Sequence, residues 1–235
     1  MCIRDRSRPA GAPVTPSAAI DEATVGGVRG MVMLQGTAPA PEVIRMNSDP
    51  VCLKQATDTN TEYFLVGDGG HLGNVFVYVK QGLEGRKFPV PTATVVLDQK
   101  GCHYIPHVFG IQVGQPLQVV NSDPTLHNIH ATPKTNAEFN TGQPIQGMKF
   151  QRQFKTKEVM VPFKCDVHGW MNAYVGVLDH PYFAVTKADG MFDMSRLPPG
   201  DYVIEAWHEK LGTQTQNVTI GPKETKDISF TFMVG

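Results

Sequence analysis

The feature that most constrains the fold is the absence of any long apolar repeat at helical spacing. From Val25 onward, apolar and polar residues alternate over short runs that end at turn-forming residues. No segment longer than ten residues keeps a 3.6-residue apolar period, whereas a period of two is typical of half-buried strands. The 23 glycines and 18 prolines suit many short strands joined by turns. The sequence therefore predicts an all-β protein with at most one short helix, in "DPVCLKQAT".

Length and charge limit the classes of protein that the chain can belong to. At 235 residues it has room for one or two domains, and two modest ones fit best. Lys and Arg number 21 against 22 Asp and Glu, with no basic block that could neutralise a run of phosphates. Nucleic acid is therefore not an expected partner. No window approaches the roughly 18 to 20 consecutive apolar residues of a transmembrane helix.

The first residues differ in composition from the rest of the chain. They are rich in Pro, Ala and Ser and lack the apolar stretch of a secretory signal, so they resemble the tether that follows one. We expect residues 1–23 to be a disordered leader or linker, and the signal peptide itself to be missing from this sequence.

The C-terminal part carries two turn motifs of a known sandwich. Thr186–Phe192 reads "T-x-x-D-G-x-F" and Leu197–Tyr202 reads "L-P-P-G-x-Y", with further Gly-containing turns before each later strand. This stretch resembles the carboxypeptidase regulatory-like (transthyretin-like) β-sandwich. That family begins with "G-x-V-x-L-x-G" and a strand like "NVFVYVK", which occur here far upstream, at Gly30–Gly36 and Asn74–Lys80.

These positions predict a sandwich interrupted by a second domain. We expect residues 24–86 and 181–235 to form the two halves of the regulatory-like sandwich, with residues 87–180 inserted between them, because domain termini usually lie close together at the surface. The alternative is an N-terminal extension packed on the middle domain, followed by a separate C-terminal domain.

The middle domain contains a possible metal-binding loop, "KCDVHGWM". Cys165, His168 and Met171 are spaced three residues apart, and His127 follows a strand and a turn upstream in "VVNSDPTLHNIHA". One thiolate, two imidazoles and a weak thioether are soft and intermediate ligands that favour copper in an electron-transfer site. We therefore expect one copper ion per chain. Structural zinc usually takes a further thiolate or carboxylate, and thioether is a poor zinc ligand.

Over this region the chain resembles the cupredoxins, the blue copper or plastocyanin-like proteins. "C-x-x-H-x-x-M" is the short ligand loop of amicyanin, and "NSDPTLHN" fits the cupredoxin pattern "N-x-D-x-x-x-H-N". The resemblance implies a Greek-key β-sandwich, a type 1 copper site, and hydrogen bonds from Asn128 that hold the ligand loops together. It also implies redox partners such as a c-type cytochrome or a periplasmic dehydrogenase.

Two further expectations concern the metal site. His130 could replace His127, but on a strand it would point to the opposite face. Three strong ligands and an axial sulfur shield the metal except at the outer edge of His168, through which we expect electrons to pass. We therefore expect no substrate bond to be made or broken, so that the protein is not an enzyme.

The remaining cysteines bear on where the protein resides. Cys2 lies in the leader, which leaves Cys52 and Cys102 as a possible pair. A disulfide between them would fit an oxidising compartment, and we expect a periplasmic or extracellular protein. The alternatives are two free buried thiols, or a second metal site that includes His103.

The function predicted from these observations is an exported one-electron carrier. Two alternatives remain open at this point. One is a cell-surface structural or binding module in which the copper site is secondary, and the other is a protein that stores or delivers copper.

Overall fold

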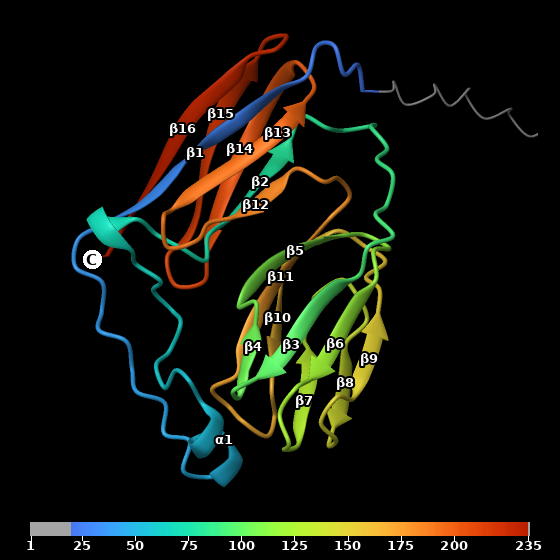
Figure 1. Cartoon of the computed structure of the whole chain (residues 1–235). Coiled ribbons are helices and arrows are strands. Elements are labelled where there is room, and N and C mark those ends of the chain that lie inside the picture. The colour runs from blue at the N-terminus through green and yellow to red at the C-terminus, as the bar shows by residue number, and fades with distance from the viewer. Residues whose placement is uncertain (1–19, 235) are drawn as a thin grey trace, which may run out of the picture.

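The computed structural model describes residues 20–234, and its fold is all-β, as predicted. Figure 1 shows two groups of sheets, one above the other, joined by several crossings of the chain. The leader expected at residues 1–23, including Cys2, falls almost wholly outside the described residues. Among the described residues, no helix is long and apolar enough to cross a membrane.

The upper group is a sandwich of two sheets whose strands come from both ends of the chain. The sheet orders are β13-β1-β16 and β12-β2-β14-β15. The bounds are β1 (Gly26–Gln35), β2 (Phe76–Gln81), β12 (Phe183–Val185), β13 (Met191–Leu197), β14 (Gly200–His208), β15 (Gly212–Ile220) and β16 (Thr225–Met233).

The early strands lie inside sheets made from the late ones. β1 pairs antiparallel with β13 and parallel with β16, while β2 lies between β12 and β14 with Tyr78 opposite Phe183 and Glu205. The pairing predicted between "NVFVYVK" and the strands after residue 180 is therefore present. We propose on this basis that residues 24–86 and 181–235 are two halves of one domain, although part of the connection between β1 and β2 packs on the other sandwich.

The lower group is a second sandwich, formed by the middle of the chain. Its sheets have the orders β5-β11-β10-β7-β8 and β4-β3-β6-β9. The bounds are β3 (Val95–Lys100), β4 (His103–Ile105), β5 (Val108–Gln112), β6 (Leu117–Asn121), β7 (His127–Ala131), β8 (Phe139–Gln143), β9 (Lys149–Arg152), β10 (Glu158–Lys164) and β11 (Asn172–Leu178). We propose that residues 87–180 form this inserted domain.

A long connection between β1 and β2 leaves the upper sandwich and packs on the lower one. It carries α1 (Pro50–Gln55) and the short 3-10 helix η1 (Asp68–Gly70), and Figure 1 shows α1 at the far end of the lower sandwich. Asp49 caps α1 and Pro50 occupies its first turn, where proline is well tolerated. Ile44, Met46 and Cys52 belong to the apolar core of the lower sandwich.

The two sandwiches meet through an apolar contact between β2 and β12 on one side and β5 and β11 on the other. Its buried members are Phe76, Tyr78, Val108 and Leu178. A Cβ atom on Gly110 would lie 2.2 Å from the Phe183 ring, and one on Gly176 would lie 2.3 Å from the Phe76 ring. Glycine at these two positions is what allows the aromatic rings to approach the backbone of the lower sandwich.

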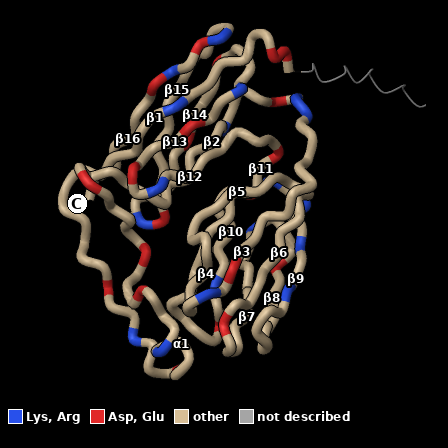
Figure 2. The backbone as a smooth tube through the Cα atoms, in the orientation of Figure 1, with Lys and Arg blue, Asp and Glu red and all other residues tan. Residues whose placement is uncertain are grey.

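Charged residues are distributed over both sandwiches. In Figure 2, Lys and Arg alternate with Asp and Glu along the backbone. This mixture agrees with the net charge of -1.

Candidate metal centre

Two segments of the lower sandwich bring three of the predicted ligands together. His127 is the first residue of β7, and Cys165 and His168 lie in the loop between β10 and β11. One ligand atom from each of these residues lies within 4.8 Å of the other two, and all three residues are buried. The residues therefore converge although nearly 40 positions separate His127 from Cys165.

Backbone hydrogen bonds close the ligand loop on itself. The Cys165 N–H donates to the Met171 carbonyl at 3.1 Å, and the Met171 N–H donates to the His168 carbonyl at 2.9 Å. The His168 N–H donates to the Cys165 sulfur at 3.3 Å. Met171 is buried in the same apolar core as Cys165, and its role as the axial ligand stays a prediction.

Two carboxylates fix the orientation of the histidine rings. Asp123 Oδ2 lies 2.9 Å from His127 Nε2, and Asp49 Oδ2 lies 3.0 Å from His168 Nε2. An ionised carboxylate only accepts hydrogen bonds, so each Nε2 carries a proton and donates it. In the neutral rings both Nδ1 atoms are then unprotonated, and they face each other at 3.0 Å.

This arrangement fits a metal ion. Two nitrogen lone pairs that face each other repel unless a proton or a cation lies between them. A carboxylate on the outer nitrogen of a histidine is also the usual support of a metal-bound imidazole. Together with the thiolate sulfur, the two Nδ1 atoms form a donor set that suits copper.

The thiol of Cys165 is prepared to act as a ligand. Burial alone raises its pKa, but the neighbouring His127 and His168 side chains and the backbone N–H groups of Asn128 and His168 outweigh burial and lower the pKa to about 6. The thiolate is the form that binds metals, so Cys165 is largely ready at neutral pH.

Asn128 joins the two ligand segments. Its Oδ1 accepts a hydrogen bond from the Asp166 N–H at 2.6 Å, and its Nδ2 donates to Asn140 Oδ1 at 2.6 Å. The Tyr104 hydroxyl donates to its carbonyl. Asn128 thus lies where it can hold the loops together, as its place in the motif predicts.

Asp123 is a supporting residue that sequence reasoning missed. Its two oxygens accept hydrogen bonds from the Gly101 and Cys102 N–H groups, each at 2.8 Å, within the turn between β3 and β4. Both turn residues have positive φ, near 60°. The sequence motif already contained this residue, because Asp123 is the aspartate of "N-x-D-x-x-x-H-N" and lies four residues before His127.

Asp49 is the second supporting residue that sequence reasoning missed, and it belongs to a segment that buries His168. The connection that contains α1 lies over the ring, so that His168 is only 1% exposed. Cys52 Sγ lies 3.6 Å from His168 Nε2, and the Trp170 ring centroid lies 5.0 Å from that of His168. The expectation that His168 has an exposed edge is therefore wrong, and the route by which electrons would reach the centre stays a prediction.

The predicted disulfide between Cys52 and Cys102 is confirmed. It links α1 to the turn between β3 and β4, with a Cα–Cα distance of 5.5 Å. Within the described part of the chain, Cys165 is the free cysteine. The alternative of a second metal site with His103 does not apply, since both cysteines are used and His103 instead contacts the Asp58 carbonyl and Glu62.

His130 lies outside the centre. Its Nδ1 contacts Asp166 Oδ2 at 2.8 Å, and its Nε2 contacts Glu138 Oε1 at 2.8 Å. Three positions along a strand reverse the side-chain direction, so His130 points away from the buried face that His127 occupies.

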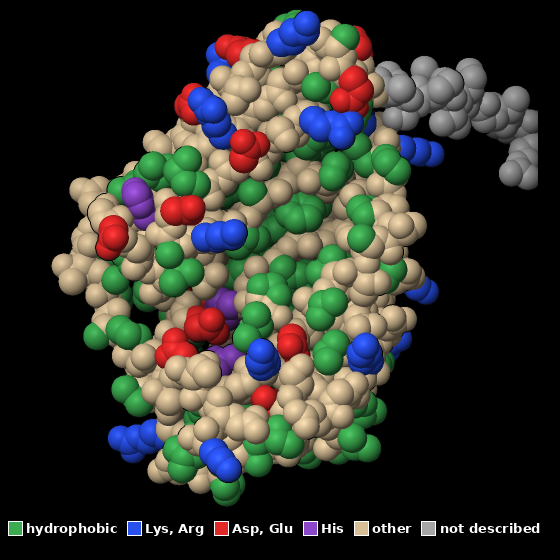
Figure 3. Space-filling model, in the orientation of Figure 1, with side chains coloured by type: hydrophobic (Ala, Val, Ile, Leu, Met, Phe, Trp, Pro, Cys, Tyr) green, Lys and Arg blue, Asp and Glu red, His purple; other side chains and the backbone are tan. Residues whose placement is uncertain are grey.

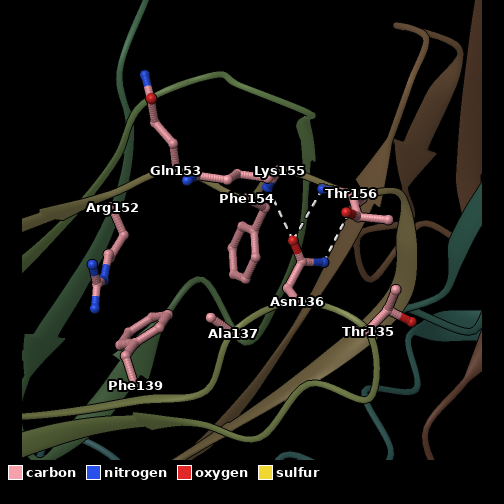
Figure 4. A pocket seen from close by; sticks show the side chains of 9 residues that line it. All are labelled: Thr135, Asn136, Ala137, Phe139, Arg152, Gln153, Phe154, Lys155 and Thr156. Carbon is pink, nitrogen blue, oxygen red and sulfur yellow. Dashed lines mark hydrogen bonds between the residues drawn. The ribbon is translucent and has the colours of Figure 1, made fainter.

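A surface cavity of the lower sandwich lies apart from the predicted ligands. A cavity of about 320 Å³ lies between the segments 135–139 and 152–156, and Figure 4 shows Asn136 hydrogen-bonded to the backbone of Lys155 and Thr156 at one side of it. None of the predicted ligands lines it.

Comparisons with known proteins give matches among solved structures alone. No family model matches the chain, and no curated protein matches it. A copper-containing nitrite reductase from Thermus scotoductus matches at 20% identity over 41% of this chain, with a TM-score of 0.35. The chain spans about a quarter of that protein's length, 24%.

Two smaller copper proteins also match. A methionine-to-glutamine mutant of amicyanin, in its Cu(I) form, matches at 19% identity over 37% of this chain and 85% of its own, with a TM-score of 0.33. A purple cupredoxin from Nitrosopumilus maritimus matches at 22% identity over 36% of this chain and 98% of its own, with a TM-score of 0.31. At these scores the case for a metal centre depends on the side-chain geometry.

The expectation that the protein is not an enzyme is corrected by these matches, because a copper enzyme, the nitrite reductase, is among them. That expectation was drawn from the four proposed ligands, which would shield the metal from a substrate. The coordination of one metal centre does not establish whether the whole protein catalyses a reaction.

Proposed function

We propose that the protein is an exported copper protein that carries single electrons, with one copper ion held by His127, Cys165, His168 and Met171. The observation that carries this proposal is the pair of carboxylate-supported histidines whose Nδ1 atoms face each other at 3.0 Å beside a buried thiol. Bound copper would supply a one-electron couple between Cu(I) and Cu(II).

The chain's own residues would keep the site nearly unchanged during electron transfer. Cys165 supplies the thiolate, and the backbone N–H of His168 hydrogen-bonds to its sulfur. Asp123 holds the His127 ring, and the loop hydrogen bonds hold Cys165 to Met171. Rigid ligands reduce the rearrangement that accompanies a change of charge, and burial and hydrogen bonding at the sulfur tune the potential.

The expected setting is the periplasm or the extracellular space. The Cys52–Cys102 disulfide supports an oxidising compartment. The partners that we propose are redox proteins such as a c-type cytochrome or a periplasmic dehydrogenase. Weak redox encounters bury less than about 1,200 Å², so a small surface near the centre suffices.

The visible spectrum of the copper-loaded protein tests the proposal. We expect an intense thiolate-to-copper band that a mild reductant bleaches reversibly. Cys165→Ser should abolish the band and leave the fold intact by circular dichroism, because a hydroxyl oxygen cannot replace the thiolate.

A matched pair of histidine variants extends this experiment. His127→Gln should lose the band, whereas His130→Gln should keep it, since His130 lies on the opposite face of β7. If Cys165→Ser keeps the wild-type band, then Cys165 is not a ligand and the proposal is wrong.

The closed edge of His168 favours a second candidate function, the storage or delivery of copper. A site covered by α1 and the disulfide retains its ion but gives a partner no bare imidazole edge. For this function we expect a colourless protein that binds Cu(I) tightly and shows no reversible colour change.

A further inference from the structure

Asp49 uses its two carboxylate oxygens for two different purposes. Oδ1 caps α1 by accepting from the N–H groups of Val51, at 2.8 Å, and Cys52, at 3.4 Å. Oδ2 accepts from Thr125 Oγ1 at 2.7 Å and from His168 Nε2 at 3.0 Å. Capping alone requires one oxygen, so the second contact is additional to the needs of the helix.

The position of Asp49 is fixed from several sides. Cys52, three residues later, is bonded to Cys102, whose N–H donates to Asp123. The carbonyl of Cys102 accepts from Trp170 Nε1 at 3.0 Å, and Trp170 packs on His168. The disulfide thus joins the carboxylate that holds His127 to the segment that holds His168.

We propose that Asp49 is a positioning residue of the metal centre. It keeps His168 in the form protonated at Nε2, with Nδ1 directed at His127 and Cys165, and its segment closes the centre from water. The role of Asp49 in copper binding rests on the proposed function. Its role in orienting the His168 ring does not, because the hydrogen bond between Asp49 and His168 is present without a metal.

Two substitutions separate positioning from helix capping. Asn and Ser are both good N-cap residues. In Asp49→Asn, an amide whose oxygen still caps α1 presents its NH₂ group to the Nε2–H of His168, so two donors face each other. In Asp49→Ser the cap is kept, but the side chain is too short to reach the ring. Asp58→Asn is the control, since the Asp58 side chain lies in the same connection and bonds only locally to Asn60.

Nitrogen NMR of the metal-free protein reads the position of the proton on His168. The measurement is made at alkaline pH, where imidazole side chains are ordinarily neutral. We expect the proton on Nε2 in the wild type and in Asp58→Asn, and a shift of the proton toward Nδ1 in both Asp49 variants. A neutral wild-type ring protonated on Nδ1, or Asp49 variants with the wild-type proton position, would overturn the proposal.

Copper affinity, measured by competition with a chelator, gives the second readout. We expect both Asp49 variants to bind copper about 10- to 100-fold more weakly than the wild type, the usual effect of losing such a support. Unchanged affinity overturns the role at the metal. If the wild type binds no copper while the NMR shift occurs, then Asp49 still positions His168 and the proposed function is the part that is wrong.

Discussion

At the scale of single residues, the charges around the centre would favour the more positive oxidation state of a metal bound there. Asp49 and Asp123 contact the outer nitrogens of His168 and His127, and the proposed site also contains the Cys165 thiolate. Hydrogen bonds from Thr125 and from the Val51 N–H, opposed by burial, hold the pKa of Asp49 at about 2, so this carboxylate stays ionised. Fixed negative charge in a poorly solvated site stabilises Cu(II) over Cu(I) and lowers the reduction potential.

Met171→Gln tests the proposed axial ligand. An amide oxygen is a harder ligand than a thioether, so the variant should keep copper and have a lower reduction potential, measured by voltammetry. Met148→Gln, at a half-exposed methionine outside the ligand loop, is the control and should not change the potential. An unchanged potential in Met171→Gln would mean that Met171 only packs in the core.

The four proposed ligands could be selected from the sequence because three of them lie within seven positions and the fourth follows a recognisable turn, and the structure brings His127, Cys165 and His168 together. Asp49 could not be predicted in the same way. It lies 119 residues from His168, and in "DPVC" it has the appearance of an ordinary helix cap. No local sequence motif indicates a contact between two residues so far apart in the chain. For the same reason, the closure of the His168 edge is visible in the structure and not in the sequence.

At the scale of elements, α1 depends on its attachments. A helix of six residues is too short to be stable alone in water. Asp49 caps it, Ile44 and Met46 anchor the preceding segment in the lower core, and the disulfide fixes it to the turn between β3 and β4. Asp49 and Cys52 also contact the His168 ring, so the stability of α1 and the shape of the site are coupled.

Replacing Cys52 and Cys102 together by alanine should lower the free energy of unfolding by about 4 kcal/mol. The disulfide closes a loop of 50 residues, and the lost loop entropy sets this figure. Urea unfolding of the metal-free protein measures it, with the wild type under reducing conditions as a second comparison. A loss below about 1 kcal/mol would show that packing alone holds α1.

The strands of the upper sandwich depend on each other across the length of the chain. β1 lies between β13 and β16, so removal of β16 leaves one side of β1 without hydrogen-bond partners. Deleting Ile220 to Gly235 should therefore reduce hydrogen-exchange protection in β1 as well as in β15. Full protection of residues 25–85 in the truncated protein, with protection lost in 181–219, would contradict the interrupted-domain proposal.

At the scale of the whole molecule, the two sandwiches share a polar contact besides their apolar one. In Figure 3, acidic and histidine side chains gather near the middle of the face shown. His107, in the lower sandwich, donates from Nδ1 to the Asn172 carbonyl at 3.1 Å and from Nε2 to Glu209 Oε1 at 2.5 Å. Both ring nitrogens meet acceptors, so the bound ring is an imidazolium paired with a carboxylate of the upper sandwich.

This ion pair should make the stability of the molecule depend on pH. Burial alone lowers the pKa of His107, but Glu209 and Glu62 outweigh it and raise the pKa. A raised folded-state pKa gives stability that is complete below the ordinary value of about 6.5 and is lost as pH rises through the folded value.

His107→Gln should reduce the free energy of unfolding at low pH by about 3 kcal/mol, since Glu209 is left buried without its partner. The difference between wild type and variant should then shrink as pH rises, because the wild-type ring loses its charge. Urea unfolding of the metal-free proteins over a series of pH values measures this difference, in which the titration of groups that the substitution does not affect cancels. Glu209→Gln removes the closer carboxylate and should also reduce the pH dependence, since Glu62 remains near the ring. Parallel curves for wild type and His107→Gln across the neutral and alkaline range would show that His107 is not charged in the folded protein.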